Sequence, residues 1–198
     1  MEIMDKSKHL HGWLFSVVLF NIFLVGWLFF VENSDEQLRL WAIYTALISF
    51  FYFVLSFSAG SLFSFFPNSV TTFIRQGRRY IGLSFALGHT FHLVAIVSFY
   101  IVMQERPSII QVIGGGLGYL AIYVMAVTSN DWAVKKLGFK RWKKIHWFGA
   151  NYIAIVFIYS YFYTLLAGQL KLTSVLLGCI IVLCFVLRLV HFFRSKNS

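Results

Sequence analysis

The chain has 198 residues, of which 59% are hydrophobic and only 12% charged, about half the charged share of an average soluble domain. This composition argues against a soluble globular protein and predicts a single membrane domain that covers residues 1–198. The net charge of +10 does not indicate nucleic-acid binding, because the basic residues lie only between apolar runs.

Six runs of sequence are nearly free of Asp, Glu, Lys and Arg, and each predicts a transmembrane helix. In chain order they are residues 13–31, 40–66, 80–103, 109–128, 145–167 and 172–191. The first run is too long for a signal peptide and no small-x-small cleavage site follows it, so we expect it to be retained. Arg188 is expected to snorkel and let the last helix continue. The prediction is an all-α integral membrane protein, a six-transmembrane-helix bundle.

The distribution of basic residues predicts the orientation. If the N-terminus is cytoplasmic, 14 of the 17 Lys and Arg residues fall on the cytoplasmic side and three outside. Such an excess is the positive-inside signal, so we expect both termini to be cytoplasmic. The longest connections, residues 67–79 and 129–144, are then inner loops, and residues 104–108 and 168–171 are tight outer turns.

Two histidines lie in the middle of the third predicted span. His89 and His92 are three residues apart and so share one side of a helix, with about 20 Å of helix between His92 and Arg79. An ionisable residue at this depth costs free energy to bury in the membrane, so its presence suggests a functional role. They are candidate ligands of heme iron, or they form a pair of interhelical hydrogen bonds. Zinc fits poorly, since no carboxylate or cysteine lies near them.

The fourth span carries a G-x-x-x-G pattern at Gly114 and Gly118. No strand precedes it and no Lys-Ser/Thr follows it, so it is not a phosphate loop. We expect these glycines to let the helix pack closely on a neighbour.

Polar residues at the inner ends of the spans are candidates for cofactor contacts. His146, at the start of the fifth span, is a metal ligand, a propionate or flavin contact, or an interface residue. The basic side chains nearby are suited to propionates or a flavin phosphate, and otherwise act as topology determinants: Arg78, Arg79, Arg141 and Lys144. No G-x-S-x-G elbow occurs and no acid lies in a span, which argues against a hydrolase and a proton-coupled transporter.

Two stretches resemble the ferric-reductase-like transmembrane domains over residues 75–167. They are Arg78-Arg79-Tyr-Ile-Gly-Leu before His92, and the run from Thr128-Ser-Asn-Asp-Trp to Lys-Lys-Ile-His146. The likeness is closest to the heme-binding membrane subunit of the bacterial periplasmic methionine sulfoxide reductase system. It implies b-type heme between the third and fifth helices of a multi-pass protein of the bacterial cytoplasmic membrane, with His92 and His146 at ligand positions.

The same resemblance implies electron transfer across the membrane to an external acceptor or a periplasmic redox partner. The chain encodes no nucleotide-binding domain, so the electron donor is expected to be a separate reductase, a bound flavin or a quinol. The alternative is a heme-free membrane scaffold or small-molecule permease.

The chain departs from the family pattern in the fifth helix, where Tyr159 occupies the place of a second histidine. His92 lies about 20 Å from the inner boundary and His146 only about 3 Å, so the two do not reach one iron in the ordinary way. Three readings stay open: His92 or His89 holds a five-coordinate heme, Tyr159 or Tyr161 completes an unusual axial pair, or heme has been lost.

Overall fold

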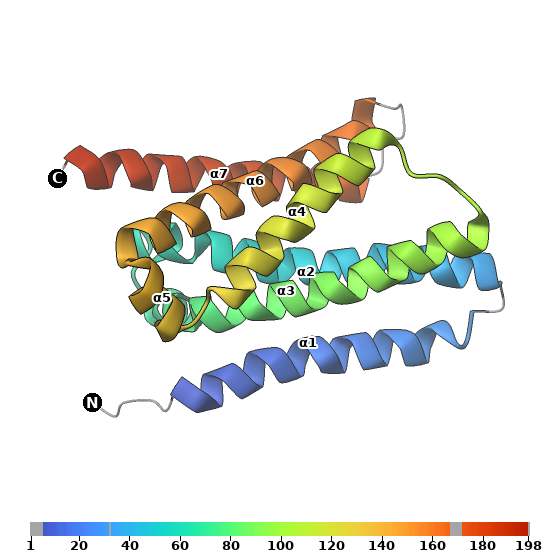
Figure 1. The fold of residues 1–198 in the computed structure, drawn as a ribbon, viewed down its shortest axis with the longest axis horizontal. Helices are drawn as coiled ribbons and strands as arrows, with labels where there is room; N and C mark the ends of the chain where they lie inside the picture. Colours follow the sequence, from blue (N-terminus) through green and yellow to red (C-terminus); the bar gives the residue numbers. More distant parts are fainter. Residues whose placement is uncertain (1–5, 32, 167–171, 198) are drawn as a thin grey trace. The chain divides into compact units, whose positions relative to one another are not determined.

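The computed structural model describes residues 6–31, 33–166 and 172–197, and these residues form helices joined by short turns (Figure 1). The prediction of an all-α protein is confirmed. The seven helices of the described chain are α1 Lys6–Leu28, α2 Ser34–Phe65, α3 Ser69–Met103, α4 Ile109–Val127, α5 Asp131–Leu137, α6 Phe139–Leu166 and α7 Leu172–Asn197.

Four stretches of the described helices are long and apolar enough to cross a bilayer. They are Ser34–Phe65, Ser69–Met103, Ile109–Val127 and Leu172–Arg194. The apolar part of α1, Gly12–Leu28, is shorter than these. Helix α6 is continuous, but polar residues such as His146 and Asn151 interrupt its apolar run. The protein is therefore a multi-pass membrane protein, and the spans predicted at α1 and α6 stay predictions.

Large apolar side chains point outward along the candidate spans. Exposed examples are Phe51 of α2, Ile101 of α3 and Ile109 of α4, with Ile109 77% exposed, and only 11% of the α4 window is buried. Water would make such a surface unstable, whereas lipid tails solvate it without cost. The outward faces of these helices are suited to contact with a lipid bilayer.

The connection before the third span is shorter than predicted, because residues 69–79 are helical. Pro67 lacks the backbone donor needed to continue α2, and the Asn68 side chain accepts from the Thr71 amide at 2.9 Å, which caps α3. The 35 residues of α3 extend about 52 Å, beyond a hydrocarbon core of about 30 Å. The expectation of a long loop at residues 67–79 was wrong.

The second predicted inner loop, residues 129–144, is also mostly helical. Asn130 caps α5 by accepting from the Ala133 amide, and Gly138 ends the helix with a φ of 76°, a conformation that favours glycine. The helix α6 then begins at Phe139, so its basic first turns precede the predicted span. Hydropathy indicated a loop here, but the Asn130 cap and Gly138 define α5 and separate it from α6.

Contacts divide the described chain into two compact units, of which one contains α1, α2 up to Ser56, and α3 from Phe73. Trp13 and Trp27 of α1 pack on Tyr52 and Tyr44 of α2, so these two helices are antiparallel. Phe85 and His92 of α3 meet Phe53 and Ala42, so α2 and α3 are antiparallel as well. At Gly88 the helices approach closely, because an added Cβ would lie 3.1 Å from Val17 Cγ2 and 3.5 Å from Ser49 Cα. This first unit carries the histidine pair.

The second unit contains residues 57–72 and the helices α4 to α7. The Arg188 guanidinium donates to the Phe57 carbonyl and lies 4.4 Å from the centre of its ring. Arg188 therefore holds α7 against the segment 57–72 in addition to allowing the helix to continue, as predicted, to Asn197.

Close packing between α4 and α6 uses a different glycine from the predicted pair. An added Cβ at Gly114 or Gly118 would meet no described atom within 4 Å, whereas one at Gly149 would lie 2.8 Å from Met125 Sδ. Gly118 is nonetheless buried, and the Gly114 carbonyl accepts from the Tyr152 hydroxyl of α6, so the packing role of the G-x-x-x-G pattern stays a prediction, while the closest approach is at Gly149.

Candidate functional site

The two mid-span histidines lie together on one side of α3, as their spacing predicted. The ring centres of His89 and His92 are 5.1 Å apart and the ring planes are inclined by 47°. Both side chains are half-buried. The ring of Phe85, one turn earlier, packs on His89 with centres 5.3 Å apart. The result is an aromatic row in the interior of an apolar helix.

The hydrogen bond of His92 determines which ring nitrogen carries its proton. The Nδ1 atom lies 3.0 Å from the carbonyl oxygen of Ala42 on α2. A carbonyl oxygen only accepts, so Nδ1 is protonated and donates, and the lone pair of neutral imidazole is then on Nε2. Among the described residues, none forms a hydrogen bond with Nε2 of His92.

The same reasoning applies to His89. Its Nδ1 atom lies 2.9 Å from Ser49 Oγ, and that hydroxyl donates its single proton to the Ala46 carbonyl. The Ser49 oxygen must therefore accept from His89, which places the His89 proton on Nδ1 as well. Helix α2 thus holds both imidazoles in the tautomer whose lone pair is on Nε2.

The α2 groups that orient the imidazoles were missed from the sequence. Ala42, Thr45 and Ser49 recur at helical spacing, and Thr45 and Ser49 are both fully buried. Thr45 Oγ1 also lies 3.4 Å from His92 Nδ1. Small hydroxyl residues repeated every four positions in an apolar span were the available signal, since such side chains hydrogen-bond across helices.

The two histidines alone are too few to hold a metal ion by protein side chains. The described residues contain no group of three or more His, Cys, Asp or Glu side chains that could hold a metal ion. A porphyrin supplies the equatorial nitrogens itself and needs only axial ligands. A hydrogen bond from the distal ring nitrogen to a carbonyl is also the usual support of a ligating histidine. The hydrogen bond from His92 Nδ1 to the Ala42 carbonyl is consistent with this pattern and also with a purely interhelical role.

The third candidate, His146, belongs to the second unit. Its Nε2 atom lies 3.0 Å from Thr128 Oγ1, and this hydroxyl already donates to the Val124 carbonyl. His146 Nε2 therefore carries the proton, and the ring stacks on Trp142 with centres 4.4 Å apart. Ligation through Nε2 would require this hydrogen bond to break.

Of the other predicted residues, Tyr161 is half-buried and its ring stacks on Phe157, and the rest lie at the surface. Tyr159 on α6 is exposed and its ring packs on Tyr163. Arg78 and Arg79 are exposed on α3, and Arg78 Nε donates to the Ser56 carbonyl. Arg141 is exposed in the first turn of α6.

A Trp142→Phe variant tests the contact that ties α6 to the end of α4. The indole Nε1 donates to the Thr128 carbonyl at 2.9 Å, and phenylalanine keeps the ring but not the donor. We expect the free energy of unfolding to fall by about 1 kcal/mol, with a Tm lower by roughly 2–4 °C. Thermal unfolding in detergent, followed by circular dichroism, measures this change.

The matched control is Trp147→Phe, five residues further along α6. Trp147 is exposed and makes ring contacts with Phe148 and Phe192 that a phenylalanine retains in part. An equal loss of stability in both variants would contradict the role of the Trp142 hydrogen bond.

No family model matches the sequence, and no solved structure matches the fold.

Proposed function

We propose that the chain is a heme b-containing, ferric-reductase-like electron-transfer subunit of a bacterial cytoplasmic membrane. In this proposal it has six spans with both termini cytoplasmic, and it passes electrons to an external acceptor or periplasmic partner. The donor is a separate reductase, a flavin or a quinol. A heme held by His92 would supply one-electron chemistry between ferric and ferrous iron.

One observation carries the proposal: the Nδ1 proton of His92 is directed to the Ala42 carbonyl, which leaves the Nε2 lone pair for a ligand. His89 has the same tautomer one turn away, with its proton held by Ser49. Two oriented imidazoles inside an apolar helix are a suitable environment for an apolar macrocycle.

The arginines of α3 have a different part in the proposal. Arg79 lies thirteen residues before His92, about 20 Å along the helix. Arg78 and Arg79 are therefore better suited to a flavin phosphate or an acidic surface of the donor than to the carboxylates of a heme on His92.

The heme-free scaffold or permease is the second candidate. It is favoured by the hydrogen bonds that His89 and His92 already form with α2, because such bonds by themselves stabilise a membrane helix pair. In that case the histidines are structural and no cofactor is present.

An absorption spectrum of the purified full-length protein from heme-replete cells separates the two functions. The redox proposal predicts a reduced-minus-oxidised difference band of b-type heme and about one heme per chain, measured with pyridine. A folded preparation without this band would overturn the proposal and favour the scaffold.

A further inference from the structure

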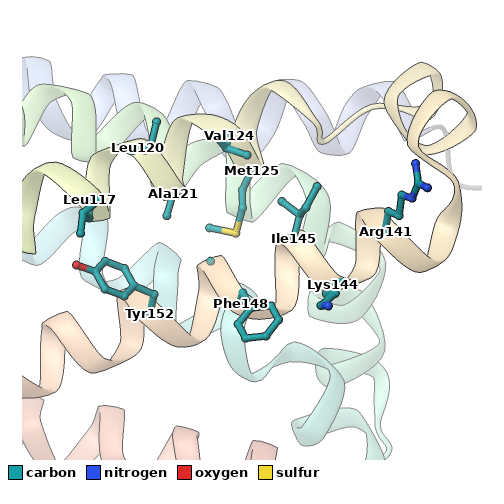
Figure 2. Close-up of a pocket in the computed structure, with 11 residues that line it drawn as sticks. Leu117, Leu120, Ala121, Val124, Met125, Arg141, Lys144, Ile145, Phe148 and Tyr152 are labelled. Atoms are coloured by element: carbon teal, nitrogen blue, oxygen red, sulfur yellow. The ribbon is translucent and has the colours of Figure 1, made fainter.

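A groove of about 760 Å³ lies between α4 and α6 in the second unit, and it differs in chemistry along its length (Figure 2). Its α4 wall includes Leu117, Ala121 and Met125, which are four residues apart and so share one side of the helix. Figure 2 shows Tyr152 at one end of the α6 wall and Arg141 at the other. The groove is therefore apolar with a cationic end.

The cationic end consists of Arg141 and Lys144, both exposed on the first turns of α6. Neither forms an ion pair with a described residue, and the Lys144 ammonium lies 5.9 Å from the centre of the Phe148 ring. Two cations next to an apolar groove are complementary to a ligand with an anionic head and an apolar tail.

The length of the groove matches one leaflet of a bilayer. Arg141 and Tyr152 are eleven residues apart, which is about 16 Å along α6. Half of a hydrocarbon core is roughly 15 Å. The far end is closed by the hydrogen bond from the Tyr152 hydroxyl to the Gly114 carbonyl, at 3.0 Å.

The floor of the groove forms where a glycine of α6 lies against a methionine of α4. Gly149 has no Cβ, and an added one would lie 2.8 Å from Met125 Sδ. The thioether therefore occupies the space beside the α6 backbone, and its flexible chain can adjust to an acyl chain.

We propose that this groove binds one acyl chain of an anionic phospholipid, whose phosphate is held by Arg141 and Lys144. This assigns Arg141 to a lipid headgroup in place of a flavin phosphate. The bound lipid fills the gap between α4 and α6 and strengthens the association of the two helices. The site is independent of heme, since all of its residues belong to the second unit.

Native mass spectrometry of the full chain in detergent tests the proposal, with phosphatidylglycerol as the probe. The Arg141→Gln/Lys144→Gln variant is expected to bind this lipid about tenfold to thirtyfold more weakly than the unaltered chain. The matched control is Lys140→Gln/Lys143→Gln, which removes the same charge from the same turns of α6 outside the groove, and should bind as the unaltered chain does.

A second variant tests the apolar part and keeps both cations. Ala121→Phe fills the groove and is expected to reduce phosphatidylglycerol binding by a similar factor, with the helical circular dichroism retained. An equal loss of phosphatidylglycerol binding in the two charge variants would overturn the proposal, because the lipid would then be attracted by the overall positive charge of α6 and not by the groove. Three other results would also overturn it. They are equal binding of phosphatidylcholine with the same acyl chains, displacement of phosphatidylglycerol by inorganic phosphate at the same concentration as the lipid, and occupation of the groove by a second copy of this chain.

Discussion

A His92→Ala variant is expected to lose its heme, with the reduced-minus-oxidised band falling at least about tenfold below that of the unaltered chain. Changes in groups that only support a metal ligand already cost about tenfold to a hundredfold in affinity, and loss of the ligand itself should cost no less. The measurement is the difference spectrum together with heme content per folded chain. His146→Ala should retain the band, because His146 Nε2 is held by Thr128.

The control for folding is His92→Gln. Its side-chain amide can donate toward the Ala42 carbonyl, as His92 Nδ1 does, but it offers no imidazole lone pair. We expect it to melt near the unaltered chain and to lack the heme band. If His89→Ala removes the band and His92→Ala does not, the ligand is His89. Unchanged spectra in both would refute the histidine site.

A Gly88→Leu variant should destabilise the first unit by about 3 kcal/mol or more, which lowers the Tm by roughly 6–12 °C. Even the Cβ would lie 3.1 Å from Val17 Cγ2 and 3.5 Å from the Ser49 backbone, so the remaining carbons must force the helices apart. Because Ser49 accepts the proton of His89, the same change should disturb the histidine pair. Thermal unfolding in detergent measures the loss.

The comparison is Gly26→Leu on α1, where an added Cβ meets no described atom within 4 Å and the residue is exposed. There we expect stability to rise by up to about 1 kcal/mol, since leucine favours a helix more than glycine does. A similar fall in Tm for both variants would show that the Gly88 contact with α2 does not limit packing.

The sequence alone determined the class of the protein and the position of its histidines. Charge-free runs of about 20 residues have one physical solution in lipid, a helix, so α2, α3, α4 and α7 were predictable from hydropathy. The shared side of His89 and His92 followed from helical spacing alone.

Helix ends and connections were less predictable, because hydropathy reports depth in the membrane and not backbone conformation. The stretch 69–79 is charged yet helical, since Asn68 caps it and Arg and Gln are good helix formers. Likewise, Asn130 and Gly138 define α5 inside a stretch whose charge indicated a loop.

Only the tertiary structure decided which groups meet. The sequence gives the period of each helix but not which residues of two helices meet, so it could not show that the closest contact between α4 and α6 joins Met125 and Gly149. The tautomers of His89 and His92 depend on Ser49 and Ala42, which lie 40 and 50 residues away along the chain, and no local pattern pairs such positions. The apolar groove with Arg141 at its end likewise arises from two helices packed antiparallel, a relation that neither sequence segment contains.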